Sequence, residues 1–299
     1  MTLLIQDKIE KIAKKSLIIQ IIYLFIKKSL EHKVSKSAAA LAYYILFAMF
    51  PLLVFLSNLL GLLDLNISAV METLSHFIPK EIIGFAENYL DYVSHTSSKT
   101  LLGFALVFSI WFPMRAVSGL VYDVRMAYHL DNPKNFFSFQ FRQFIYTIVF
   151  LIVIALTLFL SIMGENILRF IFGHLLVKTS VLSGYLLNFW QYVRFVPVGV
   201  LMFVAIGMLY AMSMDERKPF KSLLPGIIFS LLSWMIVSIG FSFYVENFAN
   251  YSIIYGTLGT VIILIMWLYM TSLILILGAE LNASIISIKN KKDNSKCGK

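Results

Sequence analysis

Six long apolar stretches separated by polar gaps constrain this chain more than any other feature. Each stretch holds 20 to 26 residues with few or no charged side chains; they are Ala38–Leu63, Leu101–Tyr122, Phe144–Met163, Phe195–Met214, Ser222–Val245 and Gly256–Ala279. About 20 apolar residues in a helix cross the ~30 Å hydrocarbon core of a bilayer. In that core only structures that bond their own backbone groups are stable. The pattern therefore predicts an all-α integral membrane protein with six transmembrane helices.

The basic residues are concentrated in alternate gaps between these stretches. The segments 1–37, 123–143, 215–221 and 282–299 hold eight, three, three and five Lys and Arg, 19 in all. The other gaps hold two in 64–100, two in 164–193 and none in 246–255. Basic residues are enriched in the cytoplasmic loops of membrane proteins. The distribution therefore predicts that the N- and C-termini are both cytoplasmic.

The overall charge of the chain indicates a lipid partner. Hydrophobic residues make up 59% of the chain and charged residues 14%, yet the net charge is +9. Because the lysines cluster where loops meet the cytoplasmic leaflet, we expect the lipid bilayer and its anionic headgroups as partners, and no nucleic acid. A homo-oligomer is possible.

Cysteine and histidine usage gives no sign of a metal site. Cys297 is the single cysteine, so neither an intrachain disulfide nor a structural Cys-based zinc site is expected. The five histidines show none of the i, i+4 spacing of a helical metal site. We expect no metal and no cofactor.

Three segments flank or interrupt the predicted membrane domain, which covers 37–284. Residues 1–36 read as an amphipathic interfacial arm, with Lys8, Lys11 and Lys15 on one helical face; the alternative is a cytoplasmic helix packed against the bundle. The pattern of residues 64–100 predicts an external cap of two short helices that are separated near Pro79. We expect the carboxylates of this cap to form a solvated face rather than an active site. Residues 285–299 predict a basic, disordered cytoplasmic tail.

Prolines and aromatic residues mark features of individual spans. Pro51 and Pro113 lie inside the first and second spans and are expected to kink them. Trp190, Tyr192 and Arg194 precede the fourth span, where we expect them to anchor it at the outer interface.

Few ionisable residues lie at membrane depth, and those are candidates for a functional site. Such a group costs roughly 2.5–3.5 kcal/mol near a helix centre on insertion scales. Arg115 lies in the cytoplasmic third of the second span and Glu280 ends the sixth. We predict that they form an ion pair, with Asp123 and Arg125 as alternative partners. A structural role for these residues, with Arg115 reaching to the interface, is the competing interpretation.

Both ends of the predicted membrane domain resemble one known family. The motif beginning Ser37-Ala-Ala-Ala-Leu-Ala-Tyr-Tyr and running to Pro51-Leu-Leu is similar to the first-span signature of the YihY/BrkB family of bacterial inner-membrane proteins. Tyr255-Gly-Thr-Leu-Gly-Thr-Val-Ile, Trp267-Leu-Tyr and Leu277-Gly-Ala-Glu-Leu-Asn-Ala resemble its last-span signature. The resemblance covers about residues 20–288. It implies a multi-pass protein of the bacterial inner (plasma) membrane.

The resemblance leaves the biochemical activity open, so function rests on the residues. Some members carry names that refer to virulence, and others an old label of a tRNA-processing ribonuclease. The sequence does not support the ribonuclease label, because it offers no His/Asp cluster to hold catalytic metals. We favour a transporter or lipid- or solute-handling protein, with a non-transporting envelope scaffold as the alternative. We do not expect an enzyme, because no nucleophile, base and metal ligands gather at membrane depth.

Overall fold

The computed structural model describes residues 17–62, 71, 78–95, 99–130, 137–153, 155–156, 195–214, 219–248 and 257–297. Nearly all of these residues are helical, and none of them lies in a β-strand. The helices are α2 (Leu17–Glu31), α3 (Val34–Leu62), α5 (Lys80–His95), α6 (Lys99–Ala127), the helix Phe137–Val153, α9 (Phe195–Met212), α10 (Leu224–Phe248) and α12 (Thr257–Cys297). The short 3-10 helix η1 (Phe220–Ser222) leads into α10.

Three of these helices are long and apolar enough to cross a membrane. They contain the segments Val34–Val54, Leu224–Val245 and Leu258–Asn290, which overlap the predicted first, fifth and sixth spans. Shorter apolar helices, Phe137–Val153 and Gly199–Met212, lie in or beside the predicted third and fourth spans. The second predicted span lies within α6. The chain is therefore an all-helical membrane protein over the residues described.

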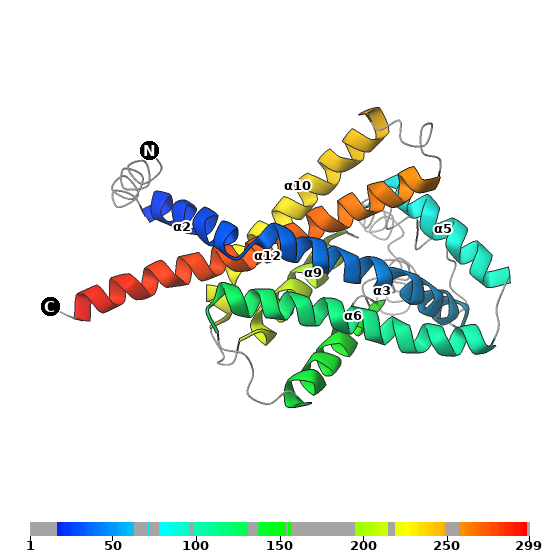
Figure 1. The fold of residues 1–299 in the computed structure, drawn as a ribbon, viewed down its shortest axis with the longest axis horizontal. Coiled ribbons are helices and arrows are strands. Elements are labelled where there is room, and N and C mark those ends of the chain that lie inside the picture. Colours follow the sequence, from blue (N-terminus) through cyan, green and yellow to red (C-terminus); the bar gives the residue numbers. More distant parts are fainter. Residues whose placement is uncertain are drawn as a thin grey trace, which may run out of the picture.

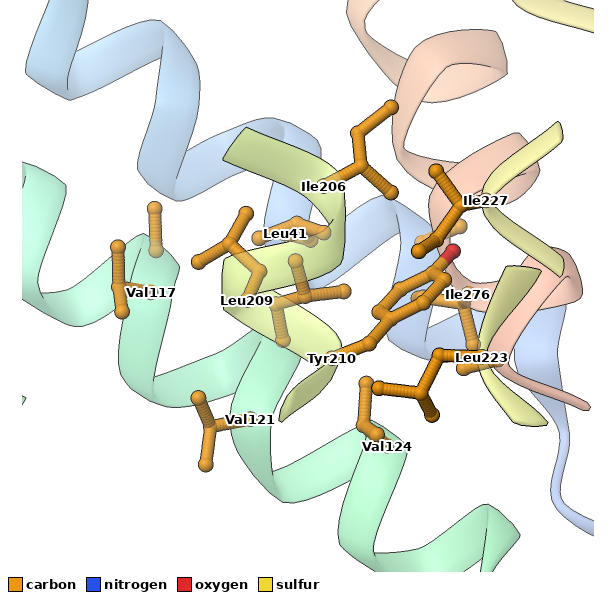
Figure 2. Close-up of a cluster of buried hydrophobic side chains, with 14 of the residues drawn as sticks. Leu41, Val117, Val121, Val124, Ile206, Leu209, Tyr210, Leu223, Ile227 and Ile276 are labelled. Atoms are coloured by element: carbon orange, nitrogen blue, oxygen red, sulfur yellow. The ribbon is translucent and has the colours of Figure 1, made fainter. Parts of the chain in front are cut away.

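The core of the bundle forms where α3 and α6 lie side by side, with α12 packed against both of them, α9 against α6, and α10 against α12 and α9 (Figure 1). Ala38 and Ala42 of α3 are both buried, as expected for small residues that let a neighbouring helix approach closely. Figure 2 shows aliphatic side chains from five helices around Tyr210, which is fully buried. Packing of this kind fixes the rotation of each helix about its axis.

The helix α5 lies where the second helix of the cap was predicted. Ile82, Ile83, Ala86 and Leu90 form its buried face and pack on the ends of α3 and α12. Figure 1 places α5 at the end of the bundle opposite to α2 and the C-terminus. The first predicted cap helix lies outside the described residues, apart from the buried Met71.

The C-terminal tail differs from the prediction. Residues 285–297, expected to be disordered, continue α12 as one helix that extends beyond the other helices (Figure 1). Extending an existing helix avoids the cost of nucleation, and Ile288 is still buried against the bundle. The predicted disordered tail is therefore wrong up to Cys297.

The prolines fall into two groups. Pro51 and Pro113 lie inside α3 and α6, and both helices continue on either side of them. Pro225 instead lies in the first turn of α10, where a missing N–H removes no hydrogen bond within the helix.

Candidate functional site: a buried polar cluster at one end of the bundle

A run of polar side chains on α12 is fully buried near the end of the bundle where α2 packs. Glu280, Asn282 and Ser284 have 0% exposure, although they lie in a candidate membrane span. Buried polar groups are stable when they form hydrogen bonds within the protein. The surrounding segments supply partners for Asn282 and for one carboxylate oxygen of Glu280, and the result is a polar cluster built on the motif Leu277-Gly-Ala-Glu-Leu-Asn-Ala.

Two glycines bring α10 and α12 into close contact at the base of this cluster. A Cβ atom added to Gly278 would overlap the hydroxyls of Ser230 and Tyr210, and one added to Gly226 would overlap the carbonyl oxygen of Gly278. Both positions therefore require the smallest residue. The close approach lets side chains of α12 reach the backbone of α10.

Asn282 joins α12 to the beginning of α10. Its Oδ1 accepts a hydrogen bond from the Gly226 backbone N–H at 2.7 Å, and its Nδ2 donates to the Leu223 carbonyl oxygen at 2.8 Å. The first N–H groups of a helix have no partner within the helix, so Asn282 satisfies one of them from a neighbouring helix. The two bonds hold the crossing of α10 and α12 in one register.

Tyr210 carries the network on from α9. Its hydroxyl lies 2.9 Å from Ser230 Oγ and donates to the Leu275 carbonyl oxygen at 2.5 Å. In Figure 2 the ring lies among Leu223, Ile227 and Ile276, so the hydroxyl is enclosed by apolar side chains. Three helices therefore meet through this one side chain.

Glu280 is the ionisable residue at the centre of the cluster. Its Oε1 lies 2.5 Å from Nδ1 of His32, which belongs to the turn between α2 and α3. Lys28 of α2 is buried within electrostatic reach of the Glu280 carboxylate. Charge on Glu280 is thus balanced from α2 and from the turn that follows it.

Asp123 and Arg125 lie at the end of α6 and are both buried. Asp123 lies beside Ser37 of α3 and within electrostatic reach of Glu280. Arg125 donates from Nη1 to the Ser213 carbonyl oxygen, 3.2 Å away, at the end of α9. The structure therefore places both residues at the same end of the bundle as Glu280.

Two residues with left-handed backbone conformations shape the outer edge of the cluster. Lys33 (φ 52°) follows His32, and His129 (φ 54°) follows the end of α6. The rings of His32 and His129 meet edge to face at 5.5 Å. Burial, reinforced by the charges of Lys28 and His32, lowers the pKa of His129 below its usual value. A neutral His129 ring therefore lies against the His32–Glu280 pair at neutral pH.

The predicted ion pair between Arg115 and Glu280 is wrong. The guanidinium of Arg115 lies 4.8 Å above the ring of Trp111, on its own helix. Arg115 is about 200° around α6 from Val117, which faces the core in Figure 2, and ~12 Å along the helix axis from Asp123. Helix rotation thus directs Arg115 away from Glu280, whose partner is His32.

Sequence reasoning named some members of the cluster and missed others. Glu280, Asp123 and Arg125 were predicted as intramembrane or membrane-edge charges, and the structure brings them to one end of the bundle. His32 was counted as one of five scattered histidines, and its distance of 248 residues from Glu280 hid the pairing. Tyr210 and Gly226 were missed as well. Trp190, Tyr192 and Arg194, predicted as interface anchors, lie outside the described residues.

The chemistry available in the cluster is hydrogen bonding and charge. Among the described residues, no three His, Cys, Asp or Glu side chains gather as metal ligands would. The cluster contains two carboxyl groups, two imidazoles, an ammonium, a guanidinium and several hydroxyls within a helical bundle. Groups of this kind bind protons, ions and polar solutes.

Comparison with known proteins places this architecture in a family. The family model described as Virulence factor BrkB matches residues 25–297. The ribonuclease-like protein YfkH of Bacillus subtilis is 28% identical over 272 residues, 91% of this chain and 97% of YfkH. A UPF0761 membrane protein of Alteromonas mediterranea is 26% identical over 281 residues, 90% of this chain and 89% of the relative. No solved structure matches the chain.

Proposed function

Because this chain belongs to the virulence factor BrkB family of membrane proteins, we propose that it moves a small solute or a lipid across or within the bacterial inner membrane. The observation that carries the proposal is the fully buried carboxylate of Glu280 on a candidate spanning helix. An ionisable group at such a position is costly, and in membrane proteins it commonly marks a pathway for an ion, proton or substrate.

The surroundings of Glu280 support a pathway more than a simple structural pair. A single carboxylate–imidazole contact would be enough to neutralise Glu280. Here Lys28, Asp123 and Arg125 add three further buried charges from α2 and α6. Each buried charge costs free energy, so a concentration of them at one end of the bundle is explained better by function than by stability.

We further propose the six-span arrangement with both termini in the cytoplasm, which puts the cluster near the cytoplasmic face. The charge asymmetry of 19 basic residues against 4 supports this orientation. Placement of α5 at the end opposite to α2 and the C-terminus fits the same arrangement (Figure 1). The cluster would then form the inner end of a route through the bundle.

A non-transporting envelope scaffold is the second candidate. The observation that favours it is the bonding of Asn282 and Tyr210, which ties α9, α10 and α12 together without leaving their polar atoms for a substrate. In that case Glu280 would serve only to seat α2 on the bundle. The two functions differ in whether a membrane containing the protein conducts or exchanges anything.

We also propose that the chain is not an enzyme. YfkH is named ribonuclease-like, but its name gives no residues that could be sought here. The described part of this chain holds no cluster that would bind catalytic metal ions. Incubating the purified protein with tRNA, with and without Mg²⁺, tests this point: cleavage that follows the protein through purification would overturn it.

Transport is tested by reconstituting the purified protein into liposomes. We expect faster ion or solute flux, or faster lipid exchange between leaflets, than in protein-free vesicles. Glu280→Gln should abolish the added rate while the protein still elutes as a folded species. The matched control is Glu31→Gln, which removes an exposed carboxylate of α2 and should leave the rate unchanged. A screen in which no flux or exchange exceeds protein-free vesicles would favour the scaffold.

A further inference from the structure

The helix α6 presents one face to its surroundings rather than to the core. Its exposed stripe follows the spacing i, i+4, i+7 of Phe104, Phe108 and Trp111, of which Phe104 and Trp111 are 61% and 46% exposed, and the partly buried Arg115 continues it at i+11. The opposite face of α6 carries Val117 and Val121, which point into the core in Figure 2. The stripe is therefore a surface feature of the bundle.

Aromatic rings continue this stripe onto α3 as an unbroken ladder. Centroid distances are 6.3 Å from Phe104 to Phe108 and 5.6 Å from Phe108 to Phe112. Phe112 then lies 5.6 Å from Phe47 of α3, and Phe47 lies 4.6 Å from Tyr43. Phe47 and Tyr43 are 40% and 56% exposed, so the ladder runs along the outside of the α3–α6 pair.

Arg115 supplies a positive charge beside this apolar ladder. Its guanidinium lies 4.8 Å from the centre of the Trp111 ring, a cation–π contact. Among the described residues, no carboxylate forms an ion pair with Arg115; Asp123, the acidic residue of α6, is buried beside Ser37 of α3 and lies ~12 Å further along the helix axis. A cation at membrane depth needs an anion, and none of the described side chains provides one at this position.

We propose that the face formed by Arg115, Trp111 and the ring ladder binds one anionic phospholipid of the inner leaflet. The guanidinium holds the phosphate through paired N–H donors, the Trp111 ring lies about one helical turn deeper in the acyl region, and an acyl chain lies along Phe108, Phe112 and Phe47. The site rests on the proposed six-span arrangement, which makes the α3–α6 surface lipid-facing. It deepens the proposed function by naming a lipid class that the protein binds from the side.

The charges favour a lipid over a second copy of this chain as the occupant. A two-fold dimer through this face would bring two copies of Arg115 together, and neither copy brings a carboxylate on the stripe. An anionic headgroup supplies the missing counter-charge. A dimer is thus the competing outcome of the test.

Quenching of tryptophan fluorescence by brominated acyl chains reports which lipid touches Trp111. The protein is placed in nanodiscs of phosphatidylglycerol and phosphatidylcholine, with bromine on one lipid and then on the other. The Trp111 signal is the difference between the unmodified protein and Trp111→Phe. We expect brominated phosphatidylglycerol to quench this signal about threefold or more over brominated phosphatidylcholine, since one basic residue near the surface enriches anionic lipid by about fivefold.

Charge variants decide whether Arg115 is responsible. Arg115→Gln should remove the preference, and Arg115→Lys should retain part of it because the charge remains. The matched control is Arg142→Gln: that guanidinium also lies over an aromatic ring of its own helix, 6.0 Å from Phe139, but away from the ladder. Arg142→Gln should leave the preference intact.

Three results would overturn the lipid site. Equal quenching by the two brominated lipids, or an unchanged lipid preference in Arg115→Gln, would show that Arg115 does not bind an anionic headgroup. If neither brominated lipid quenches Trp111 and cross-linking captures a dimer, the face is covered by a second copy of the protein instead. The measurement needs no transport, so a lost preference with intact flux would reject only the lipid site, and a preference without flux would reject only the transport proposal.

Discussion

One carboxyl oxygen of Glu280 is hydrogen-bonded to Nδ1 of His32, while its second oxygen is buried and has no hydrogen-bond partner among the described residues. A buried carboxylate held in this way depends strongly on the partner that it has. Removing one member of such a pair leaves the other buried without compensation, whereas removing both costs less. The His32–Glu280 contact should therefore behave as a coupled unit.

A double-mutant cycle measures this coupling. His32→Ala and Glu280→Leu should each destabilise the protein by about 3 kcal/mol, and the double variant should be about 1–3 kcal/mol more stable than the sum of the two losses. Thermal unfolding in detergent, measured as the loss of monodisperse protein on heating, ranks the stabilities of the variants. The control cycle is Lys27 with Glu31, an exposed pair at 4.0 Å whose coupling should stay below about 0.5 kcal/mol. Additive losses at His32 and Glu280 would mean that the contact contributes nothing.

The limits of prediction are clearest at these residues. Glu280 stood out from the sequence because a charge next to an apolar stretch needs an explanation. Arg115 stood out for the same reason, but the sequence did not fix the rotation of α6, which directs it to Trp111 rather than to Glu280. His32 lies in a turn 248 residues from Glu280 and had no local signal at all. Pairing across helices depends on tertiary packing, which no short motif encodes.

At the scale of elements, the crossing of α10 and α12 depends on two glycines. Gly226 and Gly278 lie so close that the Asn282 side chain bonds to the first turn of α10. Helices that approach this closely bring their backbones into van der Waals contact, and such packing is a main source of helix association in lipid. A methyl group at either position must push the two helices apart.

Alanine substitutions separate this crossing from general helix effects. Gly278→Ala and Gly226→Ala should each lower stability by about 1–3 kcal/mol, because the added Cβ meets atoms that cannot move away easily. Gly240→Ala, in α10 with open space around it, should be neutral or stabilising by up to about 1 kcal/mol. Melting temperatures of the three variants in one detergent provide the comparison. Equal melting temperatures for Gly278→Ala and Gly240→Ala would contradict the close crossing.

Elements were easier to predict than contacts, for a physical reason. Long apolar runs need only hydropathy and length to be recognised, so helices matching the first, second, fifth and sixth spans were found with small shifts at their ends. The continuation of α12 past Ala279 was missed because its last turns are polar and carry no membrane signal. A polar helix that grows from an existing one has no sequence mark of its own.

The molecule as a whole has two distinct ends. One carries α2, the polar cluster and the C-terminus, and the other carries α5 (Figure 1). The helix α2 packs Phe25 against Phe229 of α10, while Ile18, Ile22 and Ile26 form an exposed apolar stripe at i, i+4, i+8. Residues 1–16 of the predicted N-terminal arm, which carry its basic face, lie outside the described residues. The described helix α2 packs on the bundle and also offers an apolar face suited to the lipid interface. Its buried Lys28 joins it to the cluster.

Cysteine accessibility can assign the two ends to the two sides of the membrane. Cys297 is the only native cysteine, so it reports the C-terminus directly, and Cys297→Ser gives a background for single cysteines elsewhere. In intact cells we expect a membrane-impermeant maleimide to label Glu87→Cys, on the exposed face of α5, and to leave Cys297, Asn132→Cys and Lys218→Cys unlabelled until the cells are permeabilised. The expectation follows from the 19 basic residues concentrated in the gaps assigned to the cytoplasm.

Labelling of Cys297 in intact cells, with Glu87→Cys protected, would mean that the protein has the opposite orientation and that the Glu280 cluster lies at the outer face. Labelling of Asn132→Cys and Lys218→Cys on different sides would instead mean that the number of crossings between them is odd, and the six-span arrangement would fall.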